Sequence, residues 1–171
     1  MPQFHVNDIK SNTESYARAY LFYIKFTEDH GGLDKTKTSY LVRSSSLPEG
    51  TIDAIEVPWQ GQVYKFASTH TIPEWTCSFN MDEKSDLRKN MLTWQKKAHN
   101  LADNIQGHPD EYFGEAQLEL LDVKGSVILT YTLFQIWPSS VGSIELGYDN
   151  KDTVQFDVTF QFNWYEVDGV H

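Results

Sequence analysis

Histidine is the residue type in this sequence best suited to bind a metal ion or to transfer protons near neutral pH. The six histidines are His5, His30, His70, His99, His108 and His171. No pair has the i, i+4 helical spacing or the i, i+2 strand spacing that would direct two imidazoles at one ion. The spacing therefore favours loop or surface histidines over a metal centre, and we expect no cofactor.

The other candidates for catalysis are equally weak. Cys77 alternates with apolar residues, which favours a small buried side chain over a nucleophile. Glu115 and Glu119 would lie about 13 Å apart along a strand, farther than the roughly 6.5–9.5 Å of an inverting glycosidase pair. The sequence contains neither a Gly-x-Ser-x-Gly motif nor a glycine-rich phosphate loop. The chain is therefore not expected to be an enzyme, although carboxylates brought together from different strands would escape this test.

The elements that would position such side chains are mostly strands, and the clearest lies between residues 154 and 164. Apolar side chains occupy every second position: Val154, Phe156, Val158, Phe160, Phe162 and Trp164. The positions between them are Gln155, Asp157, Thr159, Gln161 and Asn163. This period of two predicts one long strand with a core face and a water-facing side. Because the water-facing side carries only one charge, it is typical of a barrel or sheet wall rather than of an enzyme pocket.

Further strands are predicted over residues 21–26, 39–46, 52–57, 62–67, 74–81, 116–122, 126–137 and 143–148. A helical period over residues 83–101 is set by Leu87, Met91, Trp94, Ala98 and Leu101. Asp82 or Ser85 could cap that helix. We therefore expect a mostly β fold, an antiparallel β-barrel or sandwich of about eight strands flanked by one α-helix. Residues 1–171 would form a single domain, with residues 1–15 as an N-terminal arm.

The composition limits the possible partners. The 171 residues include 14 Lys and Arg against 24 Asp and Glu, a formal charge of −10. A net negative surface argues against binding nucleic acid through its phosphates, but it does not prevent DNA from passing by. The single cysteine excludes an internal disulfide, which is typical of a protein made in a reducing cytoplasm. We also expect no secretory signal and no membrane insertion, because the apolar segments are too short.

Three groups of residues together resemble the tail tube proteins of contractile-tailed bacteriophages, which are related to the tubes of contractile injection systems. The first is Ser46-Leu47-Pro48-x-Gly50, which leads into a hairpin. The second is the strand of Trp75, followed by Met81-Asp82-Glu83 and a helix with Trp94-Gln95. The third is Ile136-Trp137-Pro138-Ser139-Ser140-Val141-Gly142, together with the last strand and Trp164-Tyr165-Glu166. The similarity runs from Leu21 to Glu166 in a single order.

The resemblance implies a structural virion protein of the tail. Six copies would form a ring whose inner strands join into one β-lined channel, and the rings would stack into a tube inside a contractile sheath. Besides other copies of itself, the expected partners are the sheath protein, the baseplate and tail-terminator proteins, the tape-measure protein, and DNA that passes through the lumen without sequence-specific binding. Joining neighbouring copies at their strand edges would also remove edges that otherwise promote aggregation.

Two sets of residues are candidates for this assembly. Residues 48–67 are expected to form a protruding hairpin that contacts the next ring. The N-terminal arm is also expected to contact the next ring. The ring-stacking candidates are Pro48, Glu49, Gly50, Trp59, Gln60 and Gly61. The lumen candidates are Gln155, Asp157, Thr159, Gln161 and Asn163, which could instead face the helix or the sheath. For Trp59, packing in its own core and contact with a partner are equally compatible with the sequence.

Three other functions remain open at this point. The chain could be a tube subunit of a non-phage contractile injection system, a monomeric β-barrel that binds a small ligand, or a hydrolase on a β-sandwich. A ligand-binding barrel would need an apolar interior cavity, and a hydrolase would need a buried carboxylate.

Overall fold

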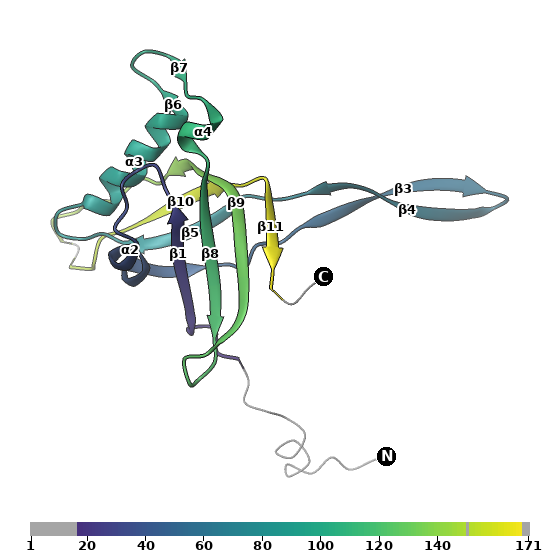
Figure 1. Ribbon diagram of the computed structural model, residues 1–171, viewed down its shortest axis with the longest axis horizontal. Helices are drawn as coiled ribbons and strands as arrows, with labels where there is room; N and C mark the ends of the chain where they lie inside the picture. Colours follow the sequence, from purple (N-terminus) through teal and green to yellow (C-terminus); the bar gives the residue numbers. More distant parts are fainter. Residues whose placement is uncertain (1–16, 150, 169–171) are drawn as a thin grey trace, which may run out of the picture.

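A computed structural model describes residues 17–149 and 151–168. The chain forms a sandwich of two antiparallel sheets that share one strand, with a long hairpin extending away from it (Figure 1). The mostly β, antiparallel fold expected from the sequence is confirmed as a sandwich; within the described residues the strand order β1-β8-β9-β10-β5-β2 does not close into a barrel. The N-terminal arm expected over residues 1–15 lies outside the described residues.

The first sheet contains four antiparallel strands. They are β1 (Phe22–Glu28), β8 (Gly114–Leu121), the first part of β9 (Val127–Val141) and β11 (Trp164–Val167). Strand β8 lies between β1 and β9, and β11 pairs with the other side of β9. The expected hairpin of residues 116–122 and 126–137 therefore forms as β8 and β9.

The second sheet contains the last part of β9, β10 (Gln155–Gln161), β5 (Trp75–Asn80) and β2 (Val42–Ser45), in that order. Strand β9 can serve both sheets because it bends at Gln135, where φ is +55° and the register with β8 shifts. Such a bulge redirects a strand. The sequence predicted an end to this strand at Pro138, but β9 continues past it and Pro138 pairs with Phe160 beside a second register shift.

Aromatic rings fill the space between the two sheets. The ring of Phe160 lies 5.5 Å from those of Phe26 and Trp75 and 6.2 Å from that of Trp94. All four side chains are buried. Full burial of each contributes about 1.5–3 kcal/mol relative to exposure, so this cluster stabilises the packing of strands β1, β5 and β10 against the helix.

Helix α3 (Asp86–Ala98) covers one side of the sandwich, and its buried residues are Leu87, Met91 and Trp94, as the helical period predicts. The Nε1–H of Trp94 donates to the carbonyl of Tyr112 over 2.7 Å. The prediction that Leu101 continues this buried face is wrong. The helix ends at Ala98, the chain turns through β6 (His99–Asn100) and β7 (Ile105–Gln106), and Leu101 is 89% exposed.

Two short helices were not predicted. Helix α2 (Lys35–Leu41) replaces the first half of the strand expected over residues 39–46, and only β2 remains of that strand. The carboxylate of Asp34 caps α2 by accepting from the backbone N–H of Lys37. Helix α4 (Pro109–Tyr112) forms a single turn before β8. The described residues therefore contain three helices rather than one.

The single strand expected over residues 154–164 is also divided. Strand β10 ends at Gln161, the chain turns at Asn163, and β11 begins at Trp164 in the other sheet. The alternation predicted that Trp164 would enter the core. Instead, its ring stacks on that of Phe134 with the ring centroids 3.8 Å apart, and Trp164 is 41% exposed. Residues 143–148, expected as a strand, are irregular.

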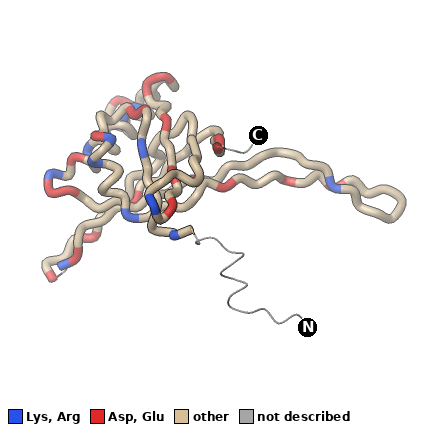
Figure 2. The backbone as a smooth tube through the Cα atoms, turned by 60° about the horizontal axis from the view of Figure 1, so that its bottom comes forward, with Lys and Arg blue, Asp and Glu red and all other residues tan. Residues whose placement is uncertain are grey.

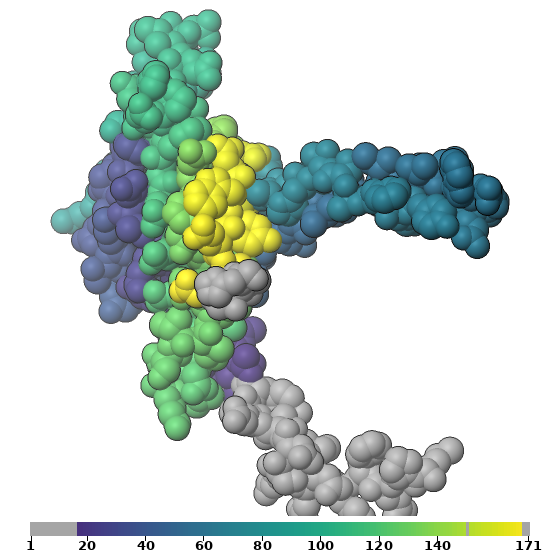
Figure 3. All heavy atoms as spheres, turned by 45° about the vertical axis from the view of Figure 1, so that its right-hand side comes forward, coloured from purple at the N-terminus to yellow at the C-terminus, as the bar shows by residue number. Residues whose placement is uncertain are grey.

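The hairpin consists of β3 (Thr51–Trp59) and β4 (Gln62–Thr71), and it includes most of the expected range 48–67. Figures 1 and 3 both show it projecting far from the sandwich to one side. Every residue of both strands is exposed. The hairpin is therefore a two-stranded ribbon that the sandwich does not cover.

Candidate assembly surfaces

The hairpin ends in a tight two-residue turn formed by Gln60 and Gly61. Both residues have positive φ, +46° and +81°. This is the geometry of a type I′ turn, whose twist matches that of a β-ribbon. The turn places Trp59 opposite Gln62 at the tip.

The register of the hairpin gives it two different faces. Ile55 pairs with Phe66 and Val57 with Tyr64, so these four side chains share one face with Trp59. The other face carries Pro58, Val63 and an ion pair of 3.0 Å between Lys65 and Glu56. We call the first one the apolar face of the hairpin, with residues Ile55, Val57, Trp59, Tyr64 and Phe66. Contiguous exposed apolar surface of this kind is typical of surfaces that bind other molecules.

The six ring-stacking candidates fall into two groups. Pro48 is buried, and Gly50 approaches its neighbours so closely that an added Cβ would lie 2.3 Å from His70 Nε2. These residues hold the base of the hairpin, and exposed Glu49 lies between them. Trp59, Gln60 and Gly61 form the tip, about 30 Å away along a nine-residue strand. With 63% of its surface exposed, Trp59 does not pack in its own core.

Four of the five lumen candidates lie on β10 in the second sheet, and each is hydrogen-bonded to a side chain from another segment. Gln161 donates to Glu74 over 2.6 Å, and the hydroxyls of Thr159 and Thr76 are 3.4 Å apart. Asp157 accepts from Ser78, and Gln155 accepts from Arg43. We call this surface the polar wall; it comprises Gln155, Asp157, Thr159 and Gln161 with Arg43, Glu74, Thr76 and Ser78.

The polar wall points away from helix α3, because the opposite faces of the same strands form the core that meets Trp94. Asn163 stands apart, in the turn after β10, where it donates to Gln135 over 2.7 Å. Sequence reasoning missed the partners on β5, although Thr76 and Ser78 alternate with buried Trp75, Cys77 and Phe79. That alternation shows which face of β5 is polar, but it does not show that β5 lies beside β10.

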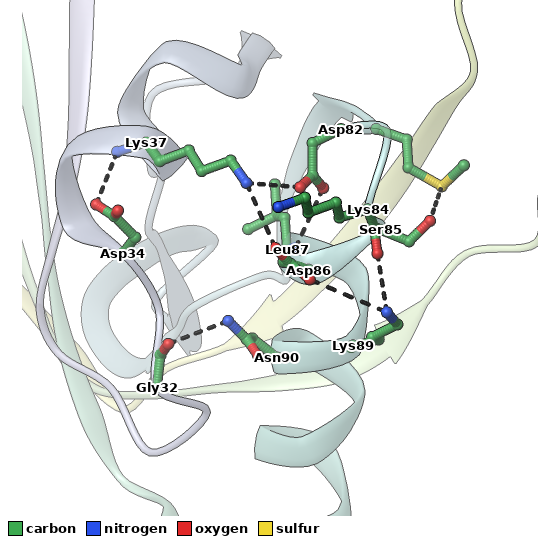
Figure 4. Close-up of polar contacts among 11 residues, drawn as sticks. Gly32, Asp34, Lys37, Asp82, Lys84, Ser85, Asp86, Leu87, Lys89 and Asn90 are labelled. Carbon is green, nitrogen blue, oxygen red and sulfur yellow. Dashed lines mark hydrogen bonds and ion pairs between the residues drawn. The ribbon is translucent and has the colours of Figure 1, made fainter.

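Charged residues form a second connection, between α2 and the start of α3 (Figure 4). The ammonium of Lys37 lies 2.6 Å from Asp82 and 3.7 Å from Asp86. Partial burial alone would raise the pKa of Asp82, but the hydrogen bonds from Lys37 and from the backbone of Leu87 and Asp86 outweigh it and lower that pKa. The hydrogen bond to Asp82 raises the pKa of Lys37. The cluster therefore connects α2 to the start of α3.

Cys77, the single cysteine, is buried in the core. Burial raises the pKa of the Cys77 thiol, which lies 3.3 Å from the hydroxyl of Ser45. Residues 17–149 and 151–168 contain no group of three His, Cys, Asp or Glu side chains arranged to hold a metal ion. Over the same residues, no helix combines the length and apolar character needed to cross a membrane.

Comparison with known proteins identifies relatives of this chain. The chain is similar to the tail tube protein gp19 of Enterobacteria phage T4, with 28% identity over 167 residues that cover 94% of this chain and 99% of that protein. The tail tube protein of Serratia phage KSP90 is 29% identical over 132 residues, covering 76% and 75% of the two chains.

Solved structures show the same fold. A chain of the sheath–tube complex of an extracellular contractile injection system in its extended state aligns with a TM-score of 0.65 at 15% identity, over 98% of this chain and 100% of that one. A chain of the tube-terminating cap of the anti-feeding prophage aligns with a TM-score of 0.69 at 15% identity, over 91% and 93%.

The phage tail tube protein family model matches residues 3–168. The match covers both sheets, the hairpin and helix α3. The resemblance of residues 21–166 to phage tail tube proteins is therefore confirmed. This chain belongs to the phage tail tube protein family and is a structural component of the virion tail.

Proposed function

We propose that six copies of this chain close into a ring and that the rings stack into the inner tail tube through which DNA is ejected. The observation that carries this proposal is the combination of the polar wall with an apolar hairpin that its own subunit leaves uncovered. Exposed apolar surface is unfavourable in water, and assembly would bury it and so lower the free energy.

Ring closure would use the edges of the second sheet. Among the described residues, strand β2 pairs with β5 alone, so its other edge would offer backbone groups to a neighbouring copy. Unpaired edges of this kind join strands of other chains readily. Repeating the contact around a ring would extend the second sheet into one wall around a central channel.

The polar wall would then line that channel. Its polar side chains are engaged with each other across strands, and its one described cation, Arg43, donates to Gln155. A surface with carboxylates from Asp157 and Glu74 repels phosphates more than it binds them. The lumen candidates of the second sheet would therefore let DNA or a tape-measure protein slide past without adhering.

The tip of the hairpin, with Trp59, Gln60 and Gly61, would contact the next ring. Pro48 and Gly50 would fix the direction in which the hairpin leaves the sandwich. The similarity of the fold to chains from a tube cap, a baseplate and a sheath–tube complex supports sheath, baseplate and terminator proteins as partners.

Two alternatives differ in how well they agree with the structure. A tube subunit of a non-phage injection system is favoured by the solved neighbours, which come from such devices; the presence of DNA in isolated particles separates it from a phage tube. A small-ligand barrel is not supported, because Phe26, Trp75 and Phe160 occupy the interior.

Negative-stain electron microscopy of the purified chain tests the proposal. The native chain should form hollow rods built from six-fold rings, and Trp59→Ala should form few or short rods while its thermal unfolding remains unchanged. A native chain that stays monomeric at high concentration would contradict tube assembly. Rods of normal length and number from Trp59→Ala would contradict the role of the hairpin tip.

A further inference from the structure

A groove of about 510 Å³ lies between the C-terminal half of helix α3, the turn after β6 and the last part of β9. Its apolar lining comes from Leu92, Ala98, Leu101, Ala102 and Trp137. Leu101 and Leu92 are both exposed, at 89% and 42%. An apolar groove of this kind is typical of surfaces that bind another molecule.

We propose that this groove receives the apolar face of the hairpin from a second copy of the chain. This inference rests on the tube function proposed above and identifies the surface that the hairpin contacts. Both surfaces are apolar, and each is exposed in the isolated subunit. An aromatic side chain such as Trp59 removes a large area from water when it enters a groove of this kind.

The occupant comes from another copy because the hairpin and the groove lie on different sides of the subunit. Figures 1 and 3 show the hairpin leaving the sandwich to one side. In Figure 1, α3 and β6 lie at the top of the sandwich. A contact between two different surfaces of identical chains is head-to-tail, and it continues from copy to copy instead of stopping at a dimer. This is the type of contact that a tube requires.

The two segments carry opposite net charges. Glu56 is paired with Lys65 on the other face of the hairpin, and Glu49 and Asp53, near its base, leave the hairpin segment acidic overall (Figure 2). The rim of the groove includes the ammonium of Lys96, next to Lys97 in the last turn of α3. Opposite charges around an apolar contact orient two partners without supplying most of the affinity.

Disulfide cross-linking tests the contact, because Cys77 is fully buried and the native chain therefore offers no accessible thiol in the folded state. Gln62→Cys places a thiol opposite Trp59 at the tip, and Leu101→Cys or Ala102→Cys places one in the groove. Each pair is combined in one chain, assembled into rods and oxidised. We expect a ladder of multimers on non-reducing gels that disappears with a reductant, since a disulfide requires the two Cα atoms to lie within about 7 Å.

The matched control combines Gln62→Cys with Val123→Cys, an exposed position in the turn between β8 and β9, and should give no ladder. Rods that give no ladder from either groove position overturn the groove assignment while the tube function stands. A second measurement compares maleimide labelling of Leu101→Cys in monomers and rods. Protection in rods is expected, and labelling at the monomer rate overturns the proposal by showing that the groove stays open.

Discussion

At the scale of single residues, close packing at Gly114 makes the interior sensitive to one added methyl group. A Cβ at this position would lie 2.4 Å from the carbonyl oxygen of Glu28 and 2.7 Å from Cζ2 of Trp94. Trp94 cannot move away easily, because it is buried and hydrogen-bonded to Tyr112. Gly114 therefore allows β8 to pass directly beside helix α3.

We expect Gly114→Ala to destabilise the monomer by about 1–3 kcal/mol, the usual cost of overpacking a core. Urea unfolding followed by tryptophan fluorescence measures the loss. Gly147→Ala is the matched control, since no atom lies within 4 Å of the added Cβ. Equal stability of the two variants would show that β8 and α3 separate at little cost.

The cluster of Lys37 and Asp82 predicts a pH dependence of stability. Because the pKa of Asp82 is lower in the folded chain than its ordinary value of 3.8, its stabilisation is complete above that value and is lost as the pH falls through the folded-state pKa. Asp82→Asn should lower the melting temperature at neutral pH, and the difference from the native chain should narrow as the pH falls below the ordinary value of 3.8.

Scanning calorimetry at a series of pH values measures this difference. Glu83→Gln, which removes the neighbouring exposed carboxylate, is the control and should leave the melting temperature nearly unchanged. A gap between the native chain and Asp82→Asn that stays constant down to the lowest pH would mean that the Lys37 contact does not stabilise the fold.

At the scale of elements, substitutions in the hairpin should change assembly without changing the stability of the subunit. Its residues are all exposed, so a charge on the apolar face should leave the unfolding of the sandwich unchanged while it blocks contact with another copy. We expect Val57→Asp to abolish rods, and Val63→Asp, on the other face, to retain most of them. Sedimentation of assembled protein gives the yield, and equal loss in both variants would contradict a one-sided contact.

The elements that the sequence predicts well are those whose side chains alternate or repeat against a single neighbouring surface. Strand β5 and helix α3 are in this class, since Trp75 and Phe79, or Leu87 and Met91, face one core. Helix α2 was missed because Thr38 is its single buried residue, which leaves no apolar period to detect. The break between β10 and β11 was missed because the alternation continues across Asn163 while the chain passes from one sheet to the other.

At the scale of the whole molecule, the orientation of the polar wall predicts how the tube treats its cargo. Asp157→Lys would place a ring of cations in the proposed lumen and remove the carboxylate that accepts from Ser78. We expect assembled tails that deliver DNA more slowly, because lysines bind the phosphates that a carboxylate repels.

The rate of DNA ejection from purified particles measures this effect, with Glu83→Lys as a control that makes the same charge change in the loop before α3. Unchanged ejection from Asp157→Lys particles would place the polar wall outside the bore. The sequence alone predicted the polar side of β10 but not its surroundings, since the pairing with β5 and β2 depends on contacts between distant segments.

In each subunit the β3–β4 hairpin leaves the sandwich on one side (Figures 1 and 3). A filament that repeats one orientation of such a subunit has polarity, with projecting ribbons at one terminus and vacant acceptors at the other. The proteins that start and stop its growth therefore need opposite shapes, and a cap made for one terminus should not seal the other.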